Sequence, residues 1–209
     1  VVLDCTGQGD GRRIRAHLRG SVGRVILGAP SPEADRTVIL GVNEGALDLA
    51  RDRVISCGGC TANALAPVVK VLDDAFGLEY GLVTTVHSYT NDQRILDLPH
   101  ADLRRARAAA LSMIPTTTDA PEAIDLALPH LEGRVDGLAV RVPTPDVSLL
   151  DLCALLKRTV DAEAVNAAFA AAAAGPLKGL LEVLDEELVS SDLVDSPARS
   201  EERRVGKEC

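Results

Sequence analysis

Aromatic residues are scarce in this chain of 209 residues, which contains two Phe, two Tyr and no Trp. Only one Met is present, so the core must be built from aliphatic side chains, chiefly Leu, Val, Ile and Ala. No segment reaches about 18 consecutive apolar residues, the length that a membrane-spanning helix needs. The first residues also lack the layout of a signal peptide. We therefore expect no membrane partner.

Basic residues are in the minority, because 22 Lys and Arg stand against 31 Asp and Glu and leave a net charge of −9. A surface of that sign repels nucleic-acid backbones and anionic lipids, so we expect no nucleic-acid partner. An anionic small substrate would need a local basic pocket in this chain.

The five cysteines are odd in number and lack the spacing of a disulfide framework, which favours a reducing, cytoplasmic location. Cys57 and Cys60 form a C-x-x-C pair, which is compatible with a redox couple or half of a metal site. Zinc would require two further ligands at suitable spacing, and no second C-x-x-C or paired His motif follows. We therefore predict no metal.

The spacing of apolar residues divides the chain into two parts. Short apolar runs alternate with one helical segment over the first 59 residues, which predicts a parallel sheet of the doubly wound α/β kind, with strands near 1–6, 23–29, 37–42 and 53–56. The later pattern predicts an α+β unit with an open mixed or antiparallel sheet. Its expected helices are 61–76, 121–131 and 162–174. The first places Leu65, Val68, Val69 and Leu72 on one face and ends at Gly77, and Asp161 caps the last. Its expected strands are 78–89, 135–142 and 147–156. Between them, 91–107 is polar and irregular, and a helical turn is expected near 103–111.

Cys60 follows two glycines at the start of a predicted helix, where unpaired N–H groups and the helix dipole stabilise a thiolate. His87 follows a predicted strand, and a Cys–His pair is a recurring way to activate a thiol. The plainer interpretations stay open at this point. Cys60 could be a small core residue, and His87 could be bonded to the backbone.

Arginines mark a candidate anion site. Arg141 lies inside an apolar run, where a guanidinium is costly unless it meets an anion, and its planar fork matches phosphate oxygens. A buried ion pair is the alternative. Arg104, Arg105 and Arg107 form a second basic cluster, which could instead be a solvated face or make ion pairs between subunits.

Six segments then resemble, in the same order, those of glyceraldehyde-3-phosphate dehydrogenases. They are SCGGCTAN (56–63), TTVHSYT (84–90), DLRRARAAA (102–110), IPTTT (114–118), RVPTP (141–145) and GPLKG (175–179). The resemblance runs from about residue 1 to 197. It implies the end of a Rossmann-like parallel sheet followed by a mixed-sheet catalytic domain, that is, α/β plus α+β.

The resemblance also implies the chemistry. Cys60 would attack the aldehyde of glyceraldehyde 3-phosphate, His87 would act as the base, and NAD or NADP would accept hydride, which leaves a thioester. Inorganic phosphate would then release 1,3-bisphosphoglycerate. The implied binding residues are Thr90 and Arg141 for the substrate phosphate, Thr61, Thr118 and Arg105 for the attacking phosphate, and Thr6 and Gly7 for the cofactor.

The domain limits expected from this resemblance are 1–59 for the end of the dinucleotide-binding domain and 60–198 for an incomplete catalytic domain. Residues 199–209 match the translation of a common sequencing adapter, and we interpret them as read-through. We expect both ends of the enzyme to be missing and the fragment to be inactive. The complete protein is expected to be a homotetramer in which the stretch from about 89 to 111 packs between subunits.

Two departures from the family pattern concern the attacking phosphate. Asp119 stands where a Gly normally follows Thr118, and Gly59 replaces a Ser. A carboxylate repels an anion near a partly desolvated site, so we expect weakened use of phosphate.

Three alternatives remain from the sequence: an erythrose-4-phosphate dehydrogenase, a non-catalytic member of the family, and a redox or metal protein built on Cys57 and Cys60. Fast alkylation of Cys60 alone would favour catalysis, whereas a joint response of both thiols would favour the last alternative.

Overall fold

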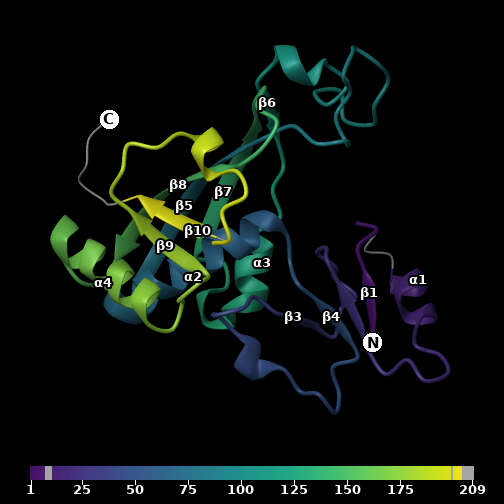
Figure 1. Ribbon diagram of the computed structural model, residues 1–209, viewed down its shortest axis with the longest axis horizontal. Helices are drawn as coiled ribbons and strands as arrows, with labels where there is room; N and C mark the ends of the chain where they lie inside the picture. The colour runs from purple at the N-terminus through teal and green to yellow at the C-terminus, as the bar shows by residue number, and fades with distance from the viewer. Residues whose placement is uncertain (8–10, 199, 204–209) are drawn as a thin grey trace.

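Two four-stranded β-sheets carry most of the fold in the computed structural model, which describes residues 1–7, 11–198 and 200–203 (Figure 1). One sheet is parallel and the other is mixed, and helices pack against both. The predicted combination of a parallel α/β sheet with a mixed α+β sheet is therefore confirmed.

The parallel sheet has the order β1-β2-β4-β3, with strands β1 Val2–Asp4, β2 Val25–Leu27, β3 Arg36–Thr37 and β4 Val54–Ser56. Helix α1 (Gly11–Ala16) buries Ile14 against β2 and β4. The strand predicted at 37–42 is largely wrong. After β3 the Asn43 side chain accepts from the Ile39 N–H (2.8 Å) and donates to the Thr37 carbonyl (2.9 Å), and these bonds turn the chain out of the sheet.

The mixed sheet has the order β6-β7-β5-β8, and its strands are β5 Leu78–His87, β6 Ile114–Thr116, β7 Val135–Arg141 and β8 Leu149–Leu156. β5 pairs parallel with β7 and antiparallel with β8, so these two consecutive strands flank β5 on opposite sides. β6 was not predicted. It pairs antiparallel with β7 at the edge of the sheet, the position where its Pro115 is tolerated because proline has no N–H to donate.

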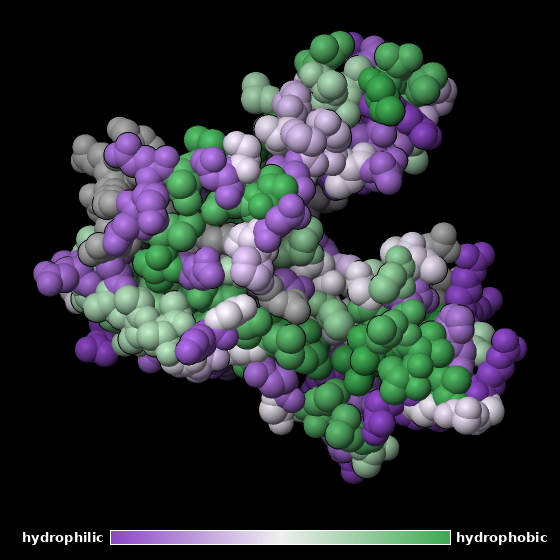
Figure 2. Space-filling model, viewed as in Figure 1, coloured by the Kyte–Doolittle hydropathy of each residue, from purple (hydrophilic) through white to green (hydrophobic). Residues whose placement is uncertain are grey.

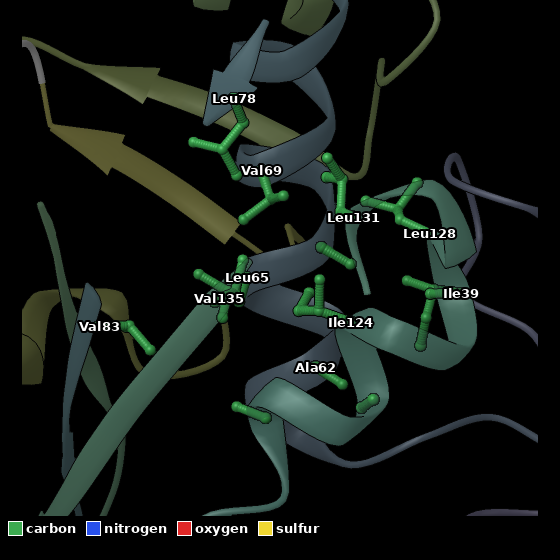
Figure 3. Packing of buried hydrophobic residues seen from close by; sticks show 14 residues of the cluster. Ile39, Ala62, Leu65, Val69, Leu78, Val83, Ile124, Leu128, Leu131 and Val135 are labelled. Carbon is green, nitrogen blue, oxygen red and sulfur yellow. The ribbon is translucent and has the colours of Figure 1, made fainter. Parts of the chain in front are cut away.

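The main core lies between α2 (Cys60–Phe76), α3 (Ala120–Ala127) and the mixed sheet (Figure 3). The predicted apolar face of α2 is confirmed at Leu65, Val69 and Leu72, which are all buried. Leu65 and Val69 pack in one cluster with Ile124 of α3. Gly77 ends α2 with a φ of +74°, a left-handed conformation that glycine adopts freely. This packing fixes where the first residue of α2 points.

The last part of the described chain adds α4 (Ala162–Ala174) and the strands β9 (Leu181–Leu184) and β10 (Ser200–Arg203). The predicted cap of α4 is confirmed, because Asp161 Oδ1 accepts from the Ala164 N–H at 2.8 Å. β9 was not predicted, and it pairs parallel with β10. The origin of residues 199–209 as read-through stays a prediction. The helices within the described ranges are all too short or too polar to cross a membrane.

The residues between β5 and β6 form an arm that extends from the body of the molecule (Figure 1). Figure 2 shows the arm separated by a notch from the part that contains the parallel sheet. The predicted helical turn is shorter than expected, a 3₁₀ turn at Ala109–Leu111. Large apolar side chains stand exposed on the arm, namely Ile95, Leu96, Leu98, Leu103, Leu111 and Met113. Such a surface is typical of a segment that docks onto a partner.

Gly137→Ala is expected to destabilise the fold, because the added Cβ would clash with the carbonyl oxygen of Val83 and lie 2.5 Å from Val83 Cγ1 on the neighbouring strand. We expect a loss of about 3 kcal/mol and a fall in Tm of about 6–12 °C. Thermal unfolding followed by circular dichroism measures the change. Gly23→Ala is the matched control, since its Cβ would meet no atom within 4 Å. Equal Tm values for the two variants would contradict the proposed clash.

Candidate active site

Cys60 is the first residue of α2, directly after β4 and a glycine turn. Gly58 has a φ of +69°, which a residue with a side chain rarely adopts. The Asn63 side chain holds the turn by donating to the Cys57 carbonyl (2.8 Å) and the Gly59 carbonyl (2.9 Å). Cys60 is exposed, and its sulfur lies at the helix N-terminus, where free N–H groups favour negative charge. The predicted position of Cys60 is therefore confirmed.

A pocket of about 350 Å³ opens beside this sulfur, and its lining is Gly28, Cys57, Gly58, Gly59, Cys60 and Asn63. Gly28 follows β2 and Cys57 follows β4, so the pocket lies at the carboxyl ends of parallel strands. Ligands of open α/β sheets bind at this edge. The lining contributes three glycines, so backbone can approach a bound group closely.

His87 ends β5, and its ring is held on both sides. Nε2 lies 3.0 Å from Thr85 Oγ1, and Nδ1 lies 3.3 Å from Ser148 Oγ. Thr85 is buried and donates its own proton to the Leu138 carbonyl at 3.2 Å, so its oxygen accepts from the ring in the tautomer that carries the proton on Nε2. Burial lowers the pKa of His87 below its ordinary value of 6.5, and the charge of Arg141 lowers it further. The negative charge of Asp119 raises this pKa and offsets part of the shift. The imidazole is thus neutral at neutral pH and able to accept a proton.

Arg141 ends β7 and pairs in register with His87, so the sheet places the two residues side by side. Its Nη1 donates to Thr90 Oγ1 at 2.8 Å and lies 3.4 Å from Gln93 Oε1. Its Nε is buried and has no hydrogen-bond partner in the described part of the chain. The structure therefore brings together Thr90 and Arg141, the two residues predicted to hold one phosphate, and leaves a donor of Arg141 unused.

Electrostatic interactions link Arg141 to the charged groups around it. Burial lowers the pKa of the Arg141 guanidinium and Arg105 lowers it further, whereas Asp92 and Cys60 raise it. The positive charge of Arg141 in turn lowers the pKa of His87. Within the described residues no hydrogen bond joins the Cys60 sulfur to the His87 ring, and the nearest polar partner of that sulfur is Thr61 Oγ1 at 3.9 Å. Cys60 and His87 therefore both interact with the charge of Arg141, and in the described ranges they make no hydrogen bond to each other.

In the described part of the chain no hydrogen bond joins the three residues predicted for a second phosphate. Thr61 is buried beside Cys60, and the Thr118 hydroxyl accepts from the Ala120 N–H at 3.2 Å. Arg105 lies on the arm, where it pairs with Asp92 and donates to Thr116 Oγ1 at 2.6 Å. These bonds engage the guanidinium of Arg105 within the arm.

Thr6 and Gly7, the predicted cofactor residues, follow β1 at the same sheet edge as the pocket. The Thr6 N–H and hydroxyl both donate to Asp4 Oδ1, at 2.9 and 2.7 Å, and these bonds lower the pKa of Asp4. Gly7 has a φ of +72° and open space around its Cα. The turn after β1 is thus shaped by its own short hydrogen bonds.

Cys57 and Cys60 line the same pocket, and both are free thiols, as are Cys5 and Cys153. In the ranges that the structure describes, no group of three or more His, Cys, Asp or Glu side chains could hold a metal ion.

Two contributors to this site were missed from the sequence. Asn63 is part of the quoted segment around Cys60, but its role in the turn was not predicted, although an Asn three residues into a helix that follows two glycines is a usable signal. Ser148 lies 61 residues after His87, and only the pairing of β5 with β8 brings them together. No local pattern marks such a contact.

Comparisons with known proteins identify the family. Residues 59–203 match the sequence profile of the glyceraldehyde 3-phosphate dehydrogenase C-terminal domain. Glyceraldehyde-3-phosphate dehydrogenase of Geobacillus stearothermophilus is 52% identical over 201 residues, which are 96% of this chain and 60% of that protein. Glyceraldehyde-3-phosphate dehydrogenase 1 of Bacillus cereus is 54% identical over 92% of this chain and 58% of its own length.

The similarity extends to other bacterial groups. Glyceraldehyde-3-phosphate dehydrogenase of Mycobacterium avium is 49% identical over 96% of this chain and 59% of its own length. The chain thus spans about 60% of the length of the curated relatives that it matches. A profile match over more than half of the chain, with identities near 50%, leaves one conclusion: this chain belongs to the glyceraldehyde 3-phosphate dehydrogenase family.

Proposed function

We propose that the protein containing this chain oxidises glyceraldehyde 3-phosphate to 1,3-bisphosphoglycerate, with NAD or NADP as the oxidant and inorganic phosphate as the acyl acceptor. The observation that carries the proposal is the arrangement of Cys60 at a helix N-terminus with His87 and Arg141 at the paired ends of β5 and β7. In this proposal the three residues supply a thiol, a base and a phosphate-binding cation to one site. The relatives described above bear the name of this activity.

The first half of the reaction uses Cys60 and His87. The sulfur of Cys60 attacks the aldehyde carbon, a C–S bond forms, and the thiol proton passes through His87 to the former carbonyl oxygen. When the resulting thiohemiacetal is oxidised, His87 takes the hydroxyl proton and a thioester remains on Cys60. The lowered pKa of His87 suits this role, because the ring is neutral before each transfer.

The substrate is held by its phosphate. Arg141 has a buried Nε without a partner and an Nη1 bonded to the Thr90 hydroxyl, so the guanidinium and this hydroxyl can bind phosphate oxygens together. Since Arg141 is the strand partner of His87, the aldehyde end is directed towards the base.

The described residues fit the reactive end of a nicotinamide cofactor. The pocket at the carboxyl ends of β2 and β4 opens beside Cys60, and Gly28, Gly58 and Gly59 leave space for a flat ring in it. Thr6 and Gly7 lie at the end of the neighbouring strand β1. A bound nicotinamide supplies the two-electron acceptor for the oxidation. The residues of this chain orient the substrate and move its protons.

A homotetramer is part of the proposal, supported by the exposed apolar side chains of the arm, which would pack against a neighbouring subunit. A cytoplasmic location stays a prediction.

The test uses protein expressed from the complete gene. Purified protein is assayed for cofactor reduction with glyceraldehyde 3-phosphate and inorganic phosphate, and intact-mass spectrometry followed by peptide mapping searches for an acyl group on Cys60. Aldehyde-dependent reduction together with acylated Cys60 supports the function. Reduction without an acyl group on Cys60, or no reduction, refutes it.

Ser148 is expected to act as a positioning residue for His87. Its hydroxyl can donate to the neutral ring at Nδ1 and accept from the charged ring, so it orients the imidazole in both states. Ser148→Ala should lower kcat about tenfold, the effect of losing one hydrogen bond, with the KM for the aldehyde unchanged. Ser148→Thr keeps the hydroxyl and should retain most of the activity. A rise in KM with constant kcat would instead assign Ser148 to substrate binding.

A further inference from the structure

Gln93 carries a buried amide at the root of the arm, shortly after the end of β5. Its side-chain oxygen accepts two hydrogen bonds, one from Arg141 Nη1 at 3.4 Å and one from the Thr90 N–H at 3.3 Å. Both partners are donors, so the orientation of the amide is determined, because exchanging its oxygen and nitrogen would set an NH₂ group against two N–H groups. Gln93 therefore contacts both residues that are proposed to bind the substrate phosphate.

The backbone around Thr90 is held by the same residue. The Gln93 N–H donates to the Thr90 carbonyl at 2.9 Å, so Gln93 bonds to both backbone groups of Thr90. The Tyr89 N–H donates to the Thr144 carbonyl at 3.1 Å, which ties this turn to the segment after β7. The Thr90 hydroxyl is thus fixed in a turn beside Arg141, whose Nη1 donates to it at 2.8 Å.

The guanidinium of Arg141 is held through one nitrogen. Within the described residues its side-chain hydrogen bonds all run from Nη1, to the Ser88 carbonyl (3.5 Å), the Thr90 hydroxyl (2.8 Å) and Gln93 Oε1 (3.4 Å). Its Nε is buried without a partner in the same residues. The acceptors therefore fix the direction of the planar fork and leave the donors of Nε and Nη2 for the oxygens of a bound anion.

The acceptors of Arg141 are uncharged, whereas those of Arg105 include carboxylates. Arg105 makes ion pairs with Asp92 and Asp102, which offset its charge. Within the described ranges Arg141 makes no ion pair, and carbonyl, hydroxyl and amide oxygens hold it instead. Its charge is therefore held in place without being neutralised, and a partly buried cation in this state attracts an anionic group strongly.

We infer that Gln93 is a positioning residue for the substrate phosphate, because its neutral amide oxygen orients Arg141 and Thr90 without offsetting the charge of the guanidinium. The inference rests on the proposed function, since it concerns how the phosphate of glyceraldehyde 3-phosphate is bound. Gln93 makes no hydrogen bond to Cys60 or His87 in the described part of the chain. A change at this position should therefore weaken binding of the phosphorylated substrate and spare the chemical step.

Two substitutions separate the orientation of Arg141 from its charge, in protein expressed from the complete gene. Gln93→Met keeps the approximate volume and removes the acceptor, so the KM for glyceraldehyde 3-phosphate should rise about tenfold, the effect of one lost hydrogen bond to a charged group. Gln93→Glu keeps the shape and adds a carboxylate that pairs with Arg141 and repels the phosphate, so this KM should rise about 100-fold. In steady-state kinetics, kcat should stay within about threefold, and the KM for glyceraldehyde, which lacks the phosphate, should change little.

Asn91→Asp is the matched control. It makes the same exchange of an amide for a carboxylate at an exposed position of the same segment, and Asn91 makes no hydrogen bond to Arg141 in the described residues. Its charge is screened by solvent, so either KM should change by less than about threefold. A rise in KM as large as that in Gln93→Glu would assign the effect to charge anywhere in the segment and overturn the inference.

The other outcomes distinguish this inference from the proposed function. Equal losses for both aldehydes in the Gln93 variants would show a merely structural role and overturn the inference. An unchanged KM in both variants, while Arg141→Leu raises it, would also overturn the inference and leave the dehydrogenase proposal intact. Absence of acylated Cys60 in the unmodified protein, measured by intact mass, overturns the proposed function and the inference with it.

Discussion

Replacing His87 by Asn in the protein expressed from the complete gene is expected to lower kcat/KM for glyceraldehyde 3-phosphate by about 10²–10⁴-fold, the usual contribution of a general base. The variant keeps a polar side chain at the end of β5 but cannot take a proton. The acid limb of the pH–rate profile should disappear with the imidazole. A variant that kept this limb would show that another group is the base.

In the unmodified protein, the acid limb of the pH–rate profile should lie at a lower pH than an ordinary His would give. Activity requires the neutral ring, so it falls as the pH drops through the pKa of His87. Because burial and Arg141 lower this pKa, the midpoint should lie below the 6.5 of an ordinary His. Asp119 raises the pKa, so Asp119→Asn should move the midpoint further towards acid.

His130→Asn provides the control for these experiments. His130 is 59% exposed and bonded to Asp73 at 2.8 Å, on the surface near the end of α2. Its replacement should leave the profile unchanged. A midpoint of the unmodified protein above 6.5 would contradict the buried, neutral state of His87.

Replacing Arg141 by Leu is expected to raise the KM for glyceraldehyde 3-phosphate by about 100-fold or more, because hydrogen bonds to charged groups contribute about 1.5–3 kcal/mol each. The loss should be far smaller for glyceraldehyde, which lacks the phosphate. Steady-state kinetics with the two aldehydes therefore separates phosphate binding from a general effect on the site.

Two further variants sharpen this prediction. Arg141→Lys keeps the charge but loses the planar fork, so it should recover only part of the affinity. Arg158→Leu removes the same charge from an exposed position, where Arg158 donates to the Ala75 carbonyl, and should change neither KM. An equal loss for both aldehydes in Arg141→Leu would show that Arg141 does not recognise the phosphate.

The sequence predicted the parts of the fold that local chemistry determines. Helix α2 follows from the spacing of Leu65, Val69 and Leu72 with a glycine after its last turn, and the cap of α4 follows from Asp161. β8 follows from its apolar run, and its burial alternates along the strand. Its place beside β5 could not be predicted, because strand order depends on contacts between residues distant in the sequence.

The sequence likewise predicted those site residues that local chemistry marks. Cys60, His87 and Arg141 each carry a local signal: a helix start, a strand end and a charge within an apolar run. The engagement of Arg105 by Asp92 and Thr116 has no such signal, since these partners lie 13 and 11 residues away across an irregular arm. The position of the Asp119 carboxylate, 3.2 Å from where a Cβ on Gly59 would stand, likewise appears only once α2 and α3 are packed together.

The paired ends of β5 and β7 also fix the spacing between two side chains. His87 and Arg141 stand on neighbouring strands whose separation, about 4.8 Å, is fixed by backbone hydrogen bonds. Inserting one residue into either strand would turn the following side chains to the opposite face, so the nearness of His87 and Arg141 depends on the register of the sheet.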